Sequence, residues 1–116
     1  MKKKVIRPFE KVHYASFPVA GFQYYQGCEV FEQLKVGIEL ELVRDDENPY
    51  DPEAVAIFYG NTHIGYVPRA CNHDICMLLD MGAGKLFEVR ICRVDPEQHP
   101  ERQIEVNVYL KNQNDC

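Results

Sequence analysis

Three short stretches of the 116-residue sequence place tyrosines among polar residues, where a packed core does not require them. Tyr24 and Tyr25 are adjacent, Tyr50 stands in an acidic segment, and Tyr66 lies just before Arg69. Nucleic-acid bases stack on exposed aromatic rings for about 1–3 kcal/mol each, and a nearby cation can hold a phosphate. Tyrosine also suits the partly buried rim of a small β-fold. The residue types leave both interpretations open.

A cluster of acidic residues in the segment 44–53 suggests a second kind of chemistry. Asp45, Asp46, Asp51 and Glu53 lie close together in sequence. Hard cations such as Mg²⁺ prefer carboxylate oxygens, and a bound metal can orient water for attack, as in a metal-dependent nuclease. No Lys or His stands close in sequence as a partner, and the segment is rich in turn formers, which is typical of a solvated surface loop. We therefore expect a protein that is not an enzyme, with a nuclease as the weaker alternative.

The cysteines indicate free thiols rather than a disulfide framework. Their number is odd, none forms a Cys-x-x-Cys pair and no secretion signal precedes them, so we expect a cytoplasmic protein. Cys71, His73 and Cys76 are all zinc-ligand types, but they lack a fourth ligand at finger spacing, and Cys76 falls in an apolar helical register. We expect no metal and no other cofactor. The remaining cysteines are Cys28, Cys92 and Cys116, the last expected to be an exposed terminal thiol.

Length and charge limit the class of protein. A chain of 116 residues, 46% of them hydrophobic, is long enough for one domain with its own core. No apolar run approaches the roughly 18–20 residues of a membrane span, so we expect no membrane association. The net charge of −5 taken alone argues against a nucleic-acid partner, because Lys and Arg supply phosphate contacts. A net charge can hide a local basic face, however, and residues 1–14 form a basic segment with Lys2, Lys3, Lys4, Arg7 and Lys11.

Apolar and polar residues alternate in several places, which predicts a mainly β chain. The segment 38–44 has the period of a half-buried strand with one solvent-facing side. Gly60 and Asn61 separate two further strands at 54–59 and 62–67, the pattern of a β-hairpin. Adjacent side chains of a strand point to opposite faces, so one of Tyr24 and Tyr25 must lie outside the core if both are in a strand. The other expected strands are 12–14, 17–25, 87–91 and 104–110.

One or two short helices interrupt these strands. The segment 28–34 predicts a short helix or turn, and Asn72 can cap a second helix whose apolar residues continue at helical spacing until Gly82. About six strands with mostly hairpin connections indicate an antiparallel sheet that curls into a small β-barrel. We expect the tail 111–116 to be frayed.

Four motifs stand in order along the chain: Phe22-Gln23-Tyr24-Tyr25-Gln26-Gly27, Asn48-Pro49-Tyr50-Asp51-Pro52-Glu53-Ala54-Val55-Ala56, Ile64-Gly65-Tyr66-Val67-Pro68-Arg69 and Leu78-Leu79-Asp80-Met81-Gly82. Together they resemble the HIRAN domain. Each motif alone is weak, but four in the right order across residues 15–110 make a chance match improbable. The resemblance implies an OB-like β-barrel at 15–110 that binds single-stranded DNA and, in helicase-linked members, captures a free 3′ end during fork remodelling.

The resemblance also implies roles for single residues at the strand end. Tyr24 and Tyr50 would sandwich the terminal base, and the Asp51 carboxylate would accept a hydrogen bond from the 3′-hydroxyl. A carboxylate repels an internal phosphate but accepts from a free hydroxyl, so it would distinguish an end from the middle of a strand. Asn48 and the backbone around Tyr25 would support the pocket.

The resemblance also implies contacts with the phosphates next to the 3′ end of the strand. Tyr66 and Arg69 fall where the family places groups that hold them. Gln23 and Pro68 occupy positions where DNA-capturing members carry an arginine and a lysine, which weakens the expected cationic contact. The chain is similar to stand-alone bacterial members, and helicase or nuclease proteins are its expected partners in DNA repair or at replication forks. A protein-interaction module that uses the aromatic rim is the main alternative.

Overall fold

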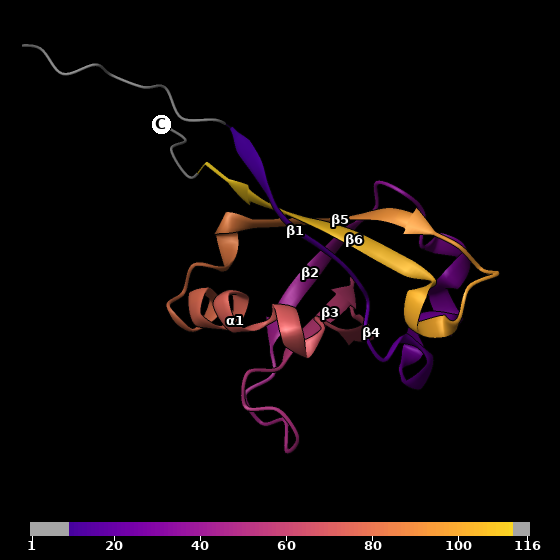
Figure 1. The fold of residues 1–116 in the computed structure, drawn as a ribbon, viewed down its shortest axis with the longest axis horizontal. Helices are drawn as coiled ribbons and strands as arrows, with labels where there is room; N and C mark the ends of the chain where they lie inside the picture. Colours follow the sequence, from indigo (N-terminus) through magenta and orange to yellow (C-terminus); the bar gives the residue numbers. More distant parts are fainter. Residues whose placement is uncertain (1–9, 113–116) are drawn as a thin grey trace, which may run out of the picture.

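One antiparallel sheet organises residues 10–112, the part of the chain that the computed structural model describes (Figure 1). Its strand order is β1-β6-β5-β2-β3-β4, so the expected six-stranded antiparallel architecture is confirmed. The frayed tail predicted at 111–116 was wrong at its start, because Lys111 is the last residue of β6 and the Asn112 N–H donates to the Glu10 carbonyl oxygen at 2.7 Å. The rest of that tail with Cys116, and the basic residues Lys2, Lys3, Lys4 and Arg7, lie outside the described residues. The strands are β1 (Lys11–Pro18), β2 (Glu39–Arg44), β3 (Val55–Tyr59), β4 (Thr62–Tyr66), β5 (Phe87–Val94) and β6 (Ile104–Lys111).

Helices occupy the connections. The segment predicted after Asn72 is α1 (His73–Asp80), and 28–34 falls largely within a 3-10 helix, as its spacing indicated. Within residues 10–112, no helix is long and apolar enough to cross a bilayer. The 3-10 helices are η1 (Phe22–Tyr24), η2 (Gln26–Gln33), η3 (Arg69–Cys71), η4 (Gly84–Leu86) and η5 (Pro100–Arg102).

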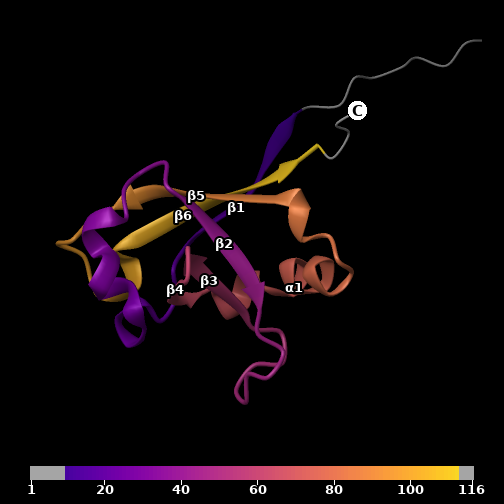
Figure 2. The same ribbon diagram turned by 180° about the vertical axis from the view of Figure 1, so that it is seen from behind.

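Strand β2 joins two groups of strands and folds the sheet over its core. Its first residues, Glu39 and Leu40, pair with β5, whereas Glu41 to Arg44 pair with β3. The long strands β1, β5 and β6 consequently lie together across one side of the molecule, and β3, β4 and α1 lie on the other (Figure 2). The side chains that fill the space between them are fully buried, among them Phe22, Leu34, Ile57, Ile64, Ile75, Ile91, Ile104 and Val106.

The sheet is not closed by strand pairing, because β1 and β4 form its two edges. An isolated bridge beyond the end of β1 brings these edges together instead, with N–H to O=C distances of 2.9 and 2.8 Å between Ala20 and Tyr66. The approach requires a glycine at position 65. A Cβ there would lie 2.4 Å from Val19 Cγ1 and 2.5 Å from the Ala20 carbonyl oxygen.

The strand predicted at 17–25 was wrong beyond Pro18, where β1 ends. The chain turns at Gly21, whose φ of 70° is a left-handed conformation that suits glycine, and then forms η1. The Gly21 N–H donates to Glu101 Oε2 at 2.8 Å, a contact between residues 80 positions apart. Tyr24 and Tyr25 therefore lie outside any strand. Both are exposed, and the argument from alternating faces does not apply to them.

Candidate functional site

A pocket of about 230 Å³, here called the loop pocket, lies where the 45–54 loop meets the end of β4. It contains six of the eight residues singled out from the sequence and leaves out Gln23 and Tyr24. Three separate segments of the chain supply the six, so the fold brings together residues that the sequence keeps apart. The pocket is lined by Ala20, Tyr25, Asn48, Tyr50, Asp51, Ala54, Tyr66, Val67 and Arg69.

Asn48 shapes the loop. Its side-chain Oδ1 accepts the backbone N–H groups of Tyr50 at 2.8 Å and Asp51 at 3.0 Å, which is how asparagine stabilises a tight turn. Its Nδ2 donates to Asp45 Oδ2 at 3.2 Å and to the Tyr66 hydroxyl at 3.4 Å. The Asn48 side chain therefore holds the turn at Tyr50 and Asp51, and its contact with the Tyr66 hydroxyl links the loop to β4.

Tyr66 lines the loop pocket and is held by Asp45, which is not itself a lining residue. The Tyr66 hydroxyl donates to Asp45 Oδ2 at 2.6 Å, a charge-assisted hydrogen bond. That bond lowers the pKa of Asp45, since it stabilises the ionised carboxylate. Burial, together with the same bond, raises the pKa of Tyr66 well above its ordinary value. Tyr66 consequently stays a neutral donor, and Asp45 holds the ring in place.

Asp51 is a mostly buried carboxylate with three protein partners. Its Oδ1 accepts the Glu53 N–H at 2.9 Å, and its Oδ2 accepts Asn72 Nδ2 at 2.9 Å and faces Arg69 Nε at 3.5 Å. Asn72 was expected to cap α1 with its side chain, which was wrong: it makes no cap hydrogen bond and reaches the loop instead. A carboxylate has roughly four acceptor positions, so one on Asp51 is left for a further donor.

Arg69 and Tyr50 form the outer rim. Arg69 Nη2 donates to the Tyr50 carbonyl oxygen at 2.6 Å, yet 69% of the arginine side chain is exposed. Tyr50 is 84% exposed, so its ring covers no core and is open to a planar ligand. Arg69 thus couples the loop to η3 and still presents positive charge to solvent.

Gln23 and Tyr24 lie on η1, beside the loop pocket rather than in it. Tyr24 is 75% exposed and Gln23 is also exposed. The next residue, Tyr25, lines the pocket, so Tyr24 is the direct chain neighbour of a lining residue. The tyrosine that the rim interpretation would have buried is therefore largely open to solvent.

His63 is a neighbour that sequence reasoning missed. Its ring lies 4.2 Å from the Tyr25 ring and 4.9 Å from the Tyr66 ring, centroid to centroid, and it stacks on Phe58 at 5.0 Å. Through these ring contacts, His63 packs against both Tyr25 and Tyr66, the two tyrosines of the pocket that it touches. The sequence carried no signal for these contacts, because strict alternation along β4 would put His63 and Tyr66 on opposite faces. The β3–β4 pairing instead has a register shift between Ile57 and Phe58.

Two of the residues considered as zinc ligands, His73 and Cys76, bind different partners. Cys76 is buried and its Sγ donates to Asp80 Oδ2 at 3.7 Å, whereas His73 Nδ1 pairs with Glu53 Oε2 at 2.5 Å. Burial raises the pKa of the Cys76 thiol, which favours its protonated form. Across residues 10–112, no group of three or more His, Cys, Asp or Glu side chains could hold a metal ion. The described cysteines Cys28, Cys71, Cys76 and Cys92 are free.

Solved structures share this fold. A crystal structure of a protein from Lactobacillus plantarum matches with a TM-score of 0.70 and 22% sequence identity, over 88% of this chain and 97% of that one. The crystal structure of the HIRAN domain of human HLTF matches with a TM-score of 0.58 and 20% identity, over 90% of this chain and 84% of that one. A comparison with curated protein sequences finds no match.

A comparison with models of protein families identifies the family of this chain. The HIRAN domain model matches residues 12–112, which include every strand residue from Val12 to Lys111 and the whole loop pocket. The four sequence motifs all lie inside this range. The chain belongs to the HIRAN domain family.

Proposed function

We propose that this HIRAN domain binds single-stranded DNA and takes the free 3′ end of a strand into the loop pocket. The observation that carries the proposal is the gathering of Tyr25, Asn48, Tyr50, Asp51, Tyr66 and Arg69 around one pocket. Their chemistry suits a nucleotide, because exposed rings can stack on a base and Arg69 can contact a phosphate. Membership of the HIRAN family supports the same ligand. We expect helicases or nucleases that act on strand ends in DNA repair or at replication forks as protein partners.

Preference for an end rests on Asp51. Its remaining acceptor position suits the O–H donor of a 3′-hydroxyl, whereas a phosphate at that place would meet a negative charge. Its three protein partners hold the carboxylate in one orientation. A strand that continues past the pocket would bring a phosphate against Asp51 and bind less tightly.

Two oligonucleotides of one sequence test this preference, one ending in a 3′-hydroxyl and the other in a 3′-phosphate. Fluorescence anisotropy at low salt should show tighter binding of the hydroxyl end. Equal affinities would overturn end recognition but leave strand binding intact. If neither oligonucleotide binds at low salt, where phosphate contacts are strongest, DNA binding is overturned and the alternative of a protein-interaction module is favoured.

Stacking is tested by Tyr24→Ala and Tyr50→Ala, each expected to weaken binding by about 1–3 kcal/mol. Both side chains are largely exposed, at 75% and 84%, so the free energy of unfolding should hardly change. Tyr50→Phe is the matched control, because it keeps the ring and should keep the affinity. A Tyr50→Ala variant that binds as tightly as the wild type would exclude stacking at this position.

A further inference from the structure

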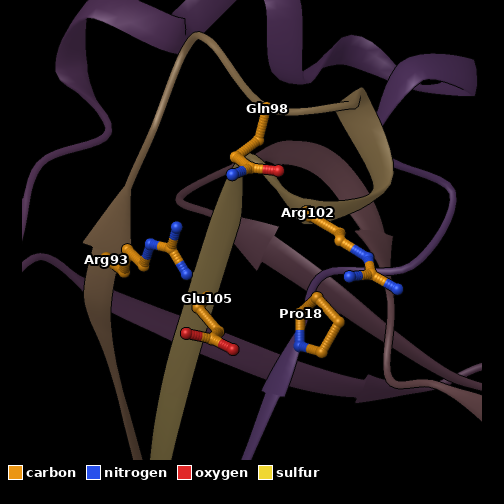
Figure 3. Close-up of a pocket in the computed structure, with 5 residues that line it drawn as sticks. All are labelled: Pro18, Arg93, Gln98, Arg102 and Glu105. Atoms are coloured by element: carbon orange, nitrogen blue, oxygen red, sulfur yellow. The ribbon is translucent and has the colours of Figure 1, made fainter.

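A second pocket, here called the arginine pocket, lies at Pro18, two residues before Ala20, which lines the loop pocket. It has a volume of about 340 Å³ and is lined by Pro18, Arg93, Gln98, Arg102 and Glu105. Strand pairing explains the arrangement, since Glu105 on β6 is in register with Pro18 on β1 and with Arg93 on β5. Gln98 and Arg102 come from the connection between β5 and β6. Figure 3 shows the two arginines on either side of Glu105.

Ion pairing inside the arginine pocket is incomplete, although two carboxylates, Asp95 and Glu105, lie beside its two arginines. Within residues 10–112, Arg102 makes no ion pair, and Glu105 makes none with either arginine. Arg93 Nη2 lies 3.3 Å from Asp95 Oδ2, but 52% of the arginine side chain is exposed. Such surface pairs contribute little and are readily exchanged for another anion. A guanidinium group matches a phosphate in geometry as well as in charge, because it can donate two parallel hydrogen bonds.

The two pockets are neighbours along the chain. Pro18 lines the arginine pocket and Ala20 lines the loop pocket, with only Val19 between them. Helix η5, which carries Arg102, contacts η1, which carries Tyr24. The hydrogen bond from Gly21 to Glu101 ties the two elements together. A strand that leaves the loop pocket across the exposed Tyr24 ring would therefore come next to Arg102.

We propose that the arginine pocket holds a backbone phosphate of the same DNA strand, upstream of the 3′-terminal nucleotide. This inference rests on the proposed function and extends its site. Two positive groups around one phosphate would supply the charge that Gln23 lacks, although Glu105 and Asp95, the partner of Arg93, reduce the effect. The pocket selects the phosphate and not the base, so it adds affinity without adding sequence preference.

The double variant Arg93→Gln with Arg102→Gln tests the pocket through the salt dependence of binding. For a single strand, removing the ionic interaction with one phosphate should reduce the slope of log affinity against log salt by about 0.7. Affinity for a long 3′-hydroxyl oligonucleotide at low salt should fall about tenfold. A terminal dinucleotide, whose single backbone phosphate would lie at Arg69 in the loop pocket, should bind both proteins equally.

Lys11→Gln is the control for the loss of a positive charge elsewhere on the protein, because Lys11 lies at the far end of β1. Seven residue steps along the strand, about 23 Å, separate Lys11 from Pro18. This control should leave the slope nearly unchanged. Glu105→Gln tests the same pocket in the opposite direction, and should raise affinity for the long oligonucleotide about two- to fivefold.

Three outcomes separate the claims. A reduced slope in the double arginine variant, with tighter binding by Glu105→Gln, supports the phosphate subsite. An unchanged slope in a variant that still prefers the 3′-hydroxyl end overturns the subsite and leaves the proposed function standing. Absence of any oligonucleotide binding by the wild-type protein overturns both. Circular dichroism of each variant identifies a loss of fold, in which case Glu105→Gln alone decides.

Discussion

The loop pocket and the arginine pocket lie on either side of the 18–20 segment, yet their side chains are held in different ways. In the loop pocket, Asn48, Asp51 and Tyr66 bond to one another or to the nearby backbone. In the arginine pocket, Arg93 has one exposed partner and Arg102 has no ion pair within residues 10–112. The lining residues of the loop pocket therefore help to stabilise the fold, whereas the arginines of the arginine pocket make few contacts on which the fold depends. Substitutions of Asn48, Asp51 or Tyr66 should lower the stability of the domain, whereas substitutions of Arg93 or Arg102 should change binding alone.

The largest effect should come from the contact that closes the sheet beside the loop pocket. Gly65→Ala would place its Cβ 2.5 Å from a backbone oxygen, which cannot move without breaking the bridge at Ala20. We expect the free energy of unfolding to fall by about 3 kcal/mol, measured by urea denaturation. Gly60→Ala is the control: its φ is 57° but its Cβ would meet open space, so about 1 kcal/mol is expected. Equal losses would show that the close approach is unimportant.

A smaller loss should follow from Asn48→Ala. Two backbone N–H groups of the loop lose their acceptor, and we expect the free energy of unfolding to fall by about 2 kcal/mol. DNA affinity should fall with it, because the turn positions Tyr50 and Asp51. Asn61→Ala provides the comparison, as Asn61 is exposed in the hairpin turn and makes no side-chain hydrogen bond within the described part of the chain. A stable Asn48→Ala protein would mean that the loop holds its shape by other contacts.

Tyr66→Phe should cost less again, about 1.5 kcal/mol, since it removes only the hydroxyl that donates to Asp45. The cost should depend on pH. A carboxyl whose pKa is lowered in the folded state contributes stability that is fully present above its unfolded pKa, 3.8 for Asp45, and is lost as the pH falls through the folded value. The difference between wild type and variant should therefore shrink in acid. Unfolding curves at neutral pH and below pH 3.8 measure it, and a constant difference would contradict the role given to Asp45.

The smallest effect concerns the link between the loop and α1. The hydrogen bond to Glu53 raises the pKa of His73 above its ordinary 6.5. Its contribution to stability is fully present below pH 6.5 and is lost as the pH rises through the folded-state pKa. His73→Gln should thus lower the melting temperature slightly at acidic pH and not at alkaline pH. A uniform change across this range would show that the ion pair contributes nothing, as expected for many exposed pairs.

Much of the sheet could be predicted because its signals are local. Burial alternates along β5 and β6 as the apolar pattern required, and glycine with asparagine marked the β3–β4 hairpin. Helix α1 followed from apolar spacing. Each of these elements is specified by side chains within a few residues of one another, so the sequence alone was enough.

The rest depended on contacts between distant residues. The turn at Gly21 is fixed by Glu101, and the side chain of Asn72 bonds to Asp51 rather than to its own helix. The aromatic residues of 22–25 favour a strand by propensity, but the buried Phe22 ring anchors a 3-10 turn. The same limit applied to His63, whose neighbour Tyr25 lies 38 positions earlier in the chain.

The bridge between Ala20 and Tyr66 has a dynamic consequence. A strand ladder opens only when many hydrogen bonds break together, whereas this junction consists of two. Local opening at such a place needs less free energy than unfolding of the whole domain. Pro18 lines the arginine pocket and Ala20 lines the loop pocket, so we expect a fluctuation of this short segment to change the shape of both pockets. Amide hydrogen exchange at Ala20 and Tyr66 would report that shared motion directly.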